Sequence, residues 1–502
     1  LDAGNFKDIL QYSRDRVYAF GITFGSIPRD WYAVGSSAIL MGYPVISDSE
    51  DTPEVRPTGV TPYEALVRET DYEELVPTCV EVRGVKVKVE EIDIPVPYAA
   101  AFEGERVRKD DLQVEFGGKH AECLEYLHTV DMDDITDGDV EVVGPSVDDV
   151  EEGDARDLGI EVKVAGREMQ EDFESILERQ IHRYVNNTNG VMHIGQRDIA
   201  WIRVSKDAYE AGFRLKHFGN ILHAKLHDEY GQIVDKVAVR LVTDQDDITD
   251  LRETAKAAYK IRDERVEGMK DEDVDIFYSC TLCQTFAPDH VCVVSPERQG
   301  LCGAYNWLDC KAAHQISPQG PNQPIEKGET IDAERGEWEG VNQFVYENSN
   351  HNVENYSQYS LMVHPMTSCG CFECIVAIVP EANGVLVVNR EYGGDTPIGM
   401  QFSTLAGQVG GGHQTPGFLG IGRRYMASDK FISFEGGFPR IVWLPSQLKE
   451  EERELLQARA EELGMPDFLD KIADENDATT SEELVEYLTE VGHPAMEMDP
   501  MV

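Results

Sequence analysis

Cysteine placement constrains this chain more than any other feature of its sequence. Eight of the ten cysteines lie in residues 278–374. They form two close groups and two single positions: Cys280, Cys283, Cys292 and Cys302; Cys369 and Cys371; Cys310 and Cys374. Clustered thiols of this kind are typical of metal sites rather than of disulfides paired across a secreted chain. We therefore interpret the rest of the chain as a scaffold for thiolate ligands.

The first group follows the pattern C-x2-C-x8-C-x9-C. Thiolates are soft ligands, and four of them suit either zinc or an iron–sulfur cluster. The unequal gaps argue against a zinc ribbon, because only Cys280 and Cys283 form a short C-x2-C pair. Four separately delivered thiolates can instead surround a four-iron cluster, which needs one thiolate per iron. An iron–sulfur cluster is therefore favoured, with a zinc site or unligated core cysteines as alternatives.

The second group is the tripeptide Cys369-Gly370-Cys371. Two thiolates one residue apart cannot both reach a tetrahedral ion without strain. They can close a planar chelate if the amide nitrogens of Gly370 and Cys371 also bind, which supplies two sulfur and two nitrogen donors. Such a square-planar site favours nickel(II) or copper(II), and glycine leaves the tight loop uncrowded. The alternative is a pair of buried cysteines at a strand edge.

Together these residues resemble the metal-cluster motif of the acetyl-CoA synthase family, the carbon-monoxide-fixing enzymes of anaerobes. Phe286, three residues after Cys283, also matches. The resemblance covers essentially the whole chain and includes residues 102–108, 115–118, 402–424 and 492–502. It implies an acyltransferase of the Wood–Ljungdahl pathway of carbon fixation. The implied reaction combines carbon monoxide, a methyl group from a corrinoid iron–sulfur protein and CoA into acetyl-CoA.

The resemblance also implies a role for each motif residue. A 4Fe-4S cluster would be held by Cys280, Cys283, Cys292 and Cys302. Cys283 would bridge this cluster to a proximal nickel ion that Cys369 and Cys371 also bind. A distal nickel ion would take the sulfurs of the same two cysteines and the amide nitrogens of Gly370 and Cys371. Phe286 would shield the open position of the proximal ion, so the implied catalytic residues are Cys283, Phe286, Cys369 and Cys371.

Charge and composition exclude several classes of partner. The chain has 94 acidic against 45 basic residues and a formal charge of −49. Nucleic acids and anionic membrane surfaces attract basic proteins, so neither is an expected partner. The sequence shows no signal-peptide pattern and no uncharged run suited to spanning a bilayer. We predict a protein with an acidic surface in a reducing, anaerobic cytoplasm.

The predicted fold class is α/β and α+β multidomain, since 502 residues suffice for about three domains. Residues 1–90 are predicted to form a partial Rossmann-like βαβ region, with strands at 16–22 and 43–47 around a helix at 28–41. Residues 91–252 are predicted as an α+β middle domain and residues 253–502 as an α+β metal-cluster domain. From residue 251 onward, helices are predicted at 251–270, 447–463 and 481–491 and strands at 375–379 and 384–389. Because the chain begins with Leu in mid-pattern, we expect a fragment or processed product. The resemblance places the surface that docks carbon monoxide dehydrogenase before Leu1.

A local excess of basic residues between Arg197 and Lys225 indicates a site for an anion in this acidic chain. CoA carries several phosphate charges and an adenine that can stack on an aromatic ring. Trp201 and Arg203 are the predicted CoA contacts, and the alternative is an ordinary core tryptophan beside a solvated arginine. Arg423 and Arg424 follow a glycine-rich segment, 407–422, which we expect to pack close to the cluster or to CoA, and are further candidate anion partners.

Two other classes of function compete with the synthase interpretation. An iron–sulfur electron-transfer or structural module needs only the four-cysteine loop and leaves the second motif unexplained. A zinc-stabilised interaction domain is the third class, and nickel content separates the synthase from both. Cys310 and Cys374 have no place in the motif and are predicted to be structural core residues.

Overall fold

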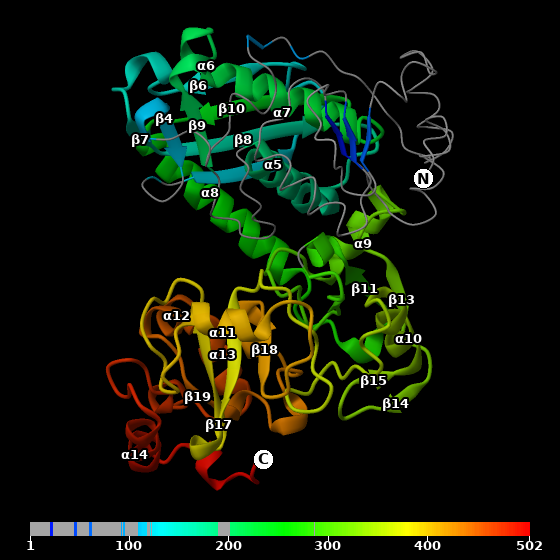
Figure 1. The fold of residues 1–502 in the computed structure, drawn as a ribbon, viewed down its shortest axis with the longest axis vertical. Coiled ribbons are helices and arrows are strands. Elements are labelled where there is room, and N and C mark those ends of the chain that lie inside the picture. Colours follow the sequence, from blue (N-terminus) through cyan, green and yellow to red (C-terminus); the bar gives the residue numbers. More distant parts are fainter. Residues whose placement is uncertain are drawn as a thin grey trace. The chain divides into compact units, whose positions relative to one another are not determined.

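The computed structural model describes residues 21–23, 45–47, 60–62, 92, 94–95, 109–117, 121, 123–188, 201–285 and 287–501. The chain divides into two compact units, Leu1–Glu91 and Ile92–Val502. Figure 1 shows the described helices and strands, which make up a mixed α and β structure with several small sheets.

The first unit contains a three-stranded parallel sheet. Its strands are β1 (Gly21–Thr23), β2 (Val45–Ser47) and β3 (Val60–Pro62), in the order β1-β2-β3. The parallel pairing of β1 and β2 is the arrangement that a βαβ unit requires. The helix expected at 28–41 lies outside the described residues. The sequence pattern also predicts a helix at 61–70, and this prediction was wrong in its first two positions, because Thr61 and Pro62 belong to β3.

The second unit begins with a four-stranded mixed sheet in the order β5-β8-β10-β6. Strand β8 pairs parallel with β5 and antiparallel with β10, which pairs parallel with β6. The strands are β5 (Cys123–Thr129), β6 (Val140–Val143), β8 (Leu158–Ala165) and β10 (Lys236–Val242). Their alternate residues point to opposite faces, and both faces are covered by helices.

Two helices cover one face of this sheet and a third covers the other. Helices α5 (Glu174–Thr188) and α7 (Leu215–Tyr230) pack on the face that belongs to the main hydrophobic core, and Figure 1 shows α7 lying along the sheet. Helix α8 (Gln245–Glu264) closes the opposite face through a smaller core of Leu124, Val242, Ile248, Leu251 and Ala255. Arg262 of α8 reaches α5, where its guanidinium lies 2.9 Å from Glu178 and 3.2 Å from Glu174.

A second small sheet, β7-β4-β9, belongs to the same region. It contains β4 (Leu112–Gly117), β7 (Asp154–Arg156) and β9 (Trp201–Ser205), and short helix α6 (Lys206–Glu210) follows β9 directly. The antiparallel register of β4 and β9 sets Glu115 opposite Arg203. This register therefore places Arg203, a predicted CoA contact, beside a carboxylate.

The cysteine-rich region contains three further sheets. The first, β12-β11-β13, contains β11 (Ile276–Cys280), β12 (Cys292–Val294) and β13 (Pro324–Glu326). A two-stranded ribbon joins β14 (Thr330–Asp332) to β15 (Glu337–Trp338). The third, β18-β16-β17-β19, contains β16 (Cys374–Val379), β17 (Gly384–Asn389), β18 (Phe418–Ile421) and β19 (Ile441–Trp443).

Helices surround these sheets: α9 (Trp307–Ile316), α10 (Glu339–Asn348), α11 (Phe402–Val409), α12 (Ser446–Glu451), α13 (Arg453–Glu462) and α14 (Ser481–Val491). The strands expected at 375–379 and 384–389 and the helix at 481–491 are confirmed. The helix expected at 447–463 is split between α12 and α13. The helix expected at 251–270 begins and ends earlier, as α8. In the part of the chain that the structure describes, no helix combines the length and apolar character needed to cross a bilayer.

His493 joins the C-terminal segment to β19 through hydrogen bonds. Its side chain is 1% exposed, its Nε2 donates to the carbonyl of Ile441 at 3.0 Å, and its Nδ1 accepts from the Ala495 N–H at 3.2 Å. The contact at Nδ1 requires the neutral ring, because a protonated Nδ1 cannot accept. Burial disfavours the charged ring and lowers the pKa of His493 to about 4.

The neutral state of His493 predicts acid sensitivity. A depressed folded-state pKa means that the unfolded chain binds the extra proton first, so stability is present above pH 6.5 and is lost as pH falls towards 4. The loss should reach about 1.4 kcal/mol per pH unit in that window. Thermal unfolding followed across this range should show this slope in the wild type and a weaker one in His493→Gln. Equal slopes in both proteins would contradict the assignment.

Candidate metal centre

The pairing of two short strands brings three cysteines of the first group together. Strand β11 ends at Cys280, β12 begins at Cys292, and the antiparallel register sets these two residues directly opposite. Cys283 follows in the short 3-10 helix η6 (Leu282–Thr285). All three side chains are at most 8% exposed. The local sequence therefore forms a strand-turn-strand loop whose sulfurs point into the protein interior.

Cys302 joins this loop from a tight turn. The N–H of Gly303 donates to the carbonyl of Gly300 at 2.9 Å. Gly303 has φ +70, and a Cβ on it would lie 2.3 Å from the carboxylate of Glu373. The positive φ of this turn favours glycine, and the Glu373 carboxylate occupies the space beside it. The Glu373 N–H, which donates to Leu301 O at 3.0 Å, joins the two cysteine segments.

A second convergence of sulfur joins the two motifs. The Sγ atoms of Cys283, Cys369 and Cys371 lie within 4.8 Å of one another. Gly370 between the last two has φ +117, a conformation that L side chains rarely adopt. The Cys371 N–H donates to Cys369 Sγ at 3.3 Å, so this amide already faces the sulfur of the tripeptide. Cys283 therefore belongs to both sulfur groups, and the spacing suits one metal ion with three thiolate ligands.

The tripeptide loop is held from two sides. Arg390 Nη2 donates to the carbonyls of Gly370 and Phe372, each at 3.0 Å. The glycine-rich segment lies on the other side, where the Gly412 N–H donates to Ser368 O at 2.8 Å. A Cβ on Gly420 would lie 2.4 Å from the Phe372 ring. The expectation that the glycine-rich backbone packs close to the cluster loops is therefore confirmed.

Burial keeps the sulfurs protonated when no cation is bound. Desolvation and the nearby Cys302 raise the pKa of Cys280 to about 12. Desolvation raises the pKa of Cys292, and the hydrogen bonds that the Cys283 thiol donates to Cys369 and Cys371 raise the pKa of Cys283. Several thiols cannot ionise together in this environment unless positive charge balances the thiolates that form. The donor set therefore fits bound metal ions, which supply that charge and displace the protons.

The middle region contributes a charged residue to the cysteine region. Helix α5 contacts α9, and Ser175 Oγ donates to Asp309 Oδ1 at 2.5 Å. One helical turn further, Arg179 is 8% exposed, and its Nη1 has no hydrogen-bond partner among the described residues. Burial raises the pKa of Cys302, and the positive charge of Arg179 opposes this rise. Arg179 therefore supplies buried positive charge beside the cysteine group.

The remaining predicted site residues differ in how far the structure describes them. Phe286 lies outside the described residues. Trp201 begins β9, where only its backbone is described. Arg203 Nε lies 2.6 Å from Glu115 Oε2, whose side chain is 4% exposed. Cys310 in α9 and Cys374 in β16 are fully buried and belong to neither sulfur group, as expected of structural residues.

The basic residues of the middle region have carboxylate partners from distant segments. Besides the Arg203–Glu115 pair, Lys206 Nζ lies 2.6 Å from Glu152 and Arg214 Nε lies 2.7 Å from Asp148. The local basic excess therefore balances acids elsewhere in the chain. Sequence reasoning missed this, because each partner is far away along the chain.

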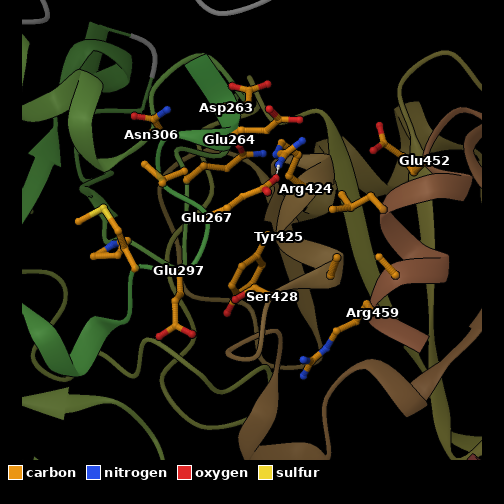
Figure 2. A pocket seen from close by; sticks show the side chains of 18 of the residues that line it. Asp263, Glu264, Glu267, Glu297, Asn306, Arg424, Tyr425, Ser428, Glu452 and Arg459 are labelled. Carbon is orange, nitrogen blue, oxygen red and sulfur yellow. Dashed lines mark hydrogen bonds and ion pairs between the residues drawn. The ribbon is translucent and has the colours of Figure 1, made fainter. Parts of the chain in front are cut away.

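Arg423 and Arg424 likewise lie beside carboxylates. Arg423 is surrounded by four glutamates at 3.0–3.9 Å: Glu373, Glu391, Glu451 and Glu452. Arg424 pairs with Glu267 at 2.8 Å in a cleft of about 980 Å³, where Figure 2 shows the two side chains together. Nine acidic and five basic residues line this cleft. Its negative charge makes it a poor site for the anionic CoA.

Sequence reasoning also missed the residues that hold the site. Arg390 and Arg179 lie in no motif, and only the fold brings them to the cysteine loops. Gly303 was weakly indicated in the sequence, because a glycine directly after a predicted ligand, Cys302, suggests a tight turn. The convergence of Cys283 with the tripeptide was expected only from the family resemblance.

The fold and the site describe an α+β protein with two adjoining groups of cysteine sulfurs. Two family models match the chain. The model for the C-terminal part of the ACS/CODH beta subunit matches residues 259–502, and that for the beta subunit of the CO dehydrogenase/acetyl-CoA synthase complex matches residues 94–248. The chain therefore belongs to the acetyl-CoA synthase family, the β-subunit family of the carbon monoxide dehydrogenase/acetyl-CoA synthase complex.

Individual relatives agree with this family. The carbon monoxide dehydrogenase/acetyl-CoA synthase subunit alpha of Moorella thermoacetica is 48% identical over 98% of this chain and 67% of its own length. An acetyl-CoA decarbonylase/synthase complex subunit beta of Methanopyrus kandleri is 48% identical over 81% of this chain and 85% of its own length. The chain spans 63% of a Methanocaldococcus jannaschii relative, so it covers about two thirds of the longer proteins. The solved C-terminal domain of an acetyl-CoA synthase alpha subunit is 54% identical over 27% of this chain and all of that domain, with a TM-score of 0.26.

The hydrogen bonds from Arg390 predict how firmly the tripeptide loop is held. In Arg390→Met protein that has not been loaded with metal, Cys369 and Cys371 should react with an alkylating reagent about tenfold faster or more. This follows because two charge-assisted hydrogen bonds, each worth about 1.5 kcal/mol or more, are lost. Mass spectrometry of the modified peptide measures the rate, and Arg424→Met is the matched control. Equal rates in the two variants would show that Arg390 does not hold the loop.

Proposed function

We propose that this chain catalyses acetyl-CoA synthesis from carbon monoxide, a methyl group and CoA, as an acyltransferase. The observation that carries the proposal is the convergence of Cys283 with Cys369 and Cys371. A thiolate shared between two metal groups needs a residue that belongs to both sulfur sets, and Cys283 meets that requirement. An electron-transfer module would need only the four-cysteine loop.

The first cysteine group would hold a 4Fe-4S cluster. Its thiols are too buried to ionise without added positive charge, and four thiolates supply one ligand to each iron of such a cluster. Arg179 would balance part of the cluster's negative charge from the side of α5. The strand register of Cys280 and Cys292 would set two ligands in place before the metal binds.

The second group would hold two nickel ions. Cys283, Cys369 and Cys371 would hold the proximal ion, while the sulfurs of the tripeptide and the amide nitrogens of Gly370 and Cys371 would hold the distal ion. When bound, the proximal nickel would supply a soft, electron-rich centre with an open position, suited to joining a carbonyl carbon and a methyl carbon. Arg390 holds the carbonyls on either side of Cys371, which fixes the direction of both sulfurs. Phe286 would shield the open position from water.

The expected partners follow from the family. A corrinoid iron–sulfur protein would deliver the methyl group and carbon monoxide dehydrogenase would deliver carbon monoxide, in a reducing cytoplasm. The relatives' names place those proteins in a carbon monoxide dehydrogenase/acetyl-CoA synthase and in acetyl-CoA decarbonylase/synthase complexes. CoA is the remaining substrate, and its proposed contacts are Trp201 and Arg203.

Metal content tests the proposal directly. Purified and nickel-incubated under anaerobic conditions, the chain should contain about two nickel, four iron and four sulfide per chain. Cys371→Ala should lose nickel and keep iron, because only the second sulfur group loses a ligand. Cys374→Ala is the matched control, since this buried cysteine three positions along belongs to neither group, and it should keep both metals.

Two outcomes would overturn the assignment. Four iron without nickel would indicate an iron–sulfur electron-transfer protein. One zinc without sulfide would indicate a structural zinc site.

The CoA contact has its own test. Because Arg203 neutralises the buried Glu115, Arg203→Ala alone would leave an unpaired buried charge, so the informative variant is Arg203→Ala with Glu115→Gln. Loss of one charge-assisted contact to a phosphate should weaken CoA binding about tenfold or more by calorimetry. Arg214→Ala, in a neighbouring ion pair, should bind CoA within twofold of the wild type. Unchanged affinity in the double variant would remove Arg203 from the site.

A further inference from the structure

A separate set of possible metal ligands, which contains no cysteine, lies in the middle region: Asp137, His223 and His227. Asp137 Oδ1 lies 3.0 Å from His223 Nε2 and 2.8 Å from His227 Nε2. All three atoms lie within 4.8 Å of one another. The two histidines are four residues apart in α7, so their rings stand on one face of the helix. The ring centroids are 4.6 Å apart, and both rings direct Nε2 at the same carboxylate oxygen.

The carboxylate is held independently of the histidines. The Val237 N–H donates to Asp137 Oδ1 at 3.0 Å, and the next residue, Gly138, donates its N–H to Val237 O at 2.9 Å. Lys236 Nζ donates to the carbonyls of Met132 and Ile135 in the same turn. Strand β10 therefore fixes the turn that carries Asp137. A ligand fixed by backbone contacts loses little freedom when it binds a metal.

The histidines are fixed from the other side. Helix α7 packs on β10 and β6 through fully buried residues that include Leu222 and Leu226, next to the two histidines in sequence. Gly219 of the same helix allows this contact, because a Cβ there would lie 2.4 Å from Val140 of β6. Figure 1 shows α7 lying along these strands. Helix and turn are therefore anchored to the same sheet, and the three ligand atoms face each other across a short gap.

The spacing fits a small divalent ion. With bonds of about 2.0–2.2 Å to nitrogen and oxygen, ligands 2.8–3.0 Å apart subtend roughly a right angle at a zinc ion. Opening the three atoms to tetrahedral spacing needs a shift of only about 0.5 Å. The side chains of Asp137, His223 and His227 are 45%, 27% and 23% exposed, so a fourth position faces solvent.

We propose that Asp137, His223 and His227 form a surface site for Zn²⁺, separate in its ligands from the thiolate centre. Two imidazoles and one carboxylate are the borderline and hard donors that zinc accepts, whereas soft low-valent metals prefer the cysteines. The ion would join the turn at residues 131–139 to α7 and keep a position for water. Without an ion, the same contacts are hydrogen bonds that need a proton on each Nε2, so metal binding and this hydrogen-bonded state exclude each other.

Zinc content after equilibrium dialysis tests this proposal on the metal-loaded protein, in which the cysteine sulfurs are already occupied. The wild type should take up one additional zinc per chain. Asp137→Asn, His223→Gln and His227→Gln should each lose it. The matched control is His128→Gln, because His128 Nε2 also contacts a carboxylate, that of Glu161 at 3.2 Å, but has no third ligand in the convergent groups. This control should keep the additional ion.

Substitution with Co²⁺ identifies the ligands. The bound cobalt should show visible d–d absorption without the near-ultraviolet charge-transfer band that thiolate ligands produce, and the three variants should lack it. Circular dichroism and the cysteine-bound iron and nickel should be unchanged in every variant, which separates failure of this site from failure of the proposed synthase function. No additional ion in the wild type, or one retained in all three variants, would overturn the proposal.

Discussion

Buried sulfur that must carry negative charge is the constraint on which this structure depends. The thiols of Cys280, Cys283 and Cys292 lie almost entirely out of solvent, where desolvation and neighbouring sulfurs raise their pKa values. They can act as ligands only if metal ions replace their protons. Gly420 lets its strand approach the tripeptide loop closely, because a Cβ there would lie 2.4 Å from the Phe372 ring.

In this strongly acidic chain, several arginines are placed where they neutralise carboxylates from distant segments. Arg203, Arg214, Arg262 and Arg423 each contact carboxylates from distant segments. Arg262 ties α8 to α5, and α5 in turn presents Ser175 and Arg179 to the cysteine region. Ion pairs in the middle region therefore position the helix that brings positive charge to the metal centre. This is a physical reason for two regions of different fold to form one compact unit.

Local patterns predicted the elements whose contacts are also local. Strands β16 and β17 form an antiparallel hairpin of apolar residues, and α14 begins with a capping box between Thr480 and Glu483. Both agree with the predicted ranges. Predictions failed where a distant segment decided the outcome, as at Thr61, which pairs with Ile46 of β2 instead of starting a helix. The Rossmann-like character of the first region and the three domain boundaries stay predictions, as do the metal ligands and the CoA contacts.

The sequence by itself determined the ligand types, the spacing within each motif, the excess of acidic charge and the family. These depend on residue identity and on short separations along the chain, which the covalent backbone alone sets. Only the tertiary structure decided that Cys283 faces Cys369 and Cys371, that Arg390 holds their loop, and that Asp137 meets two histidines of α7. It also decided that basic residues which look free in sequence have carboxylate partners. The physical reason is that these contacts depend on strand register and helix packing between segments far apart in the chain, and no local pattern encodes either.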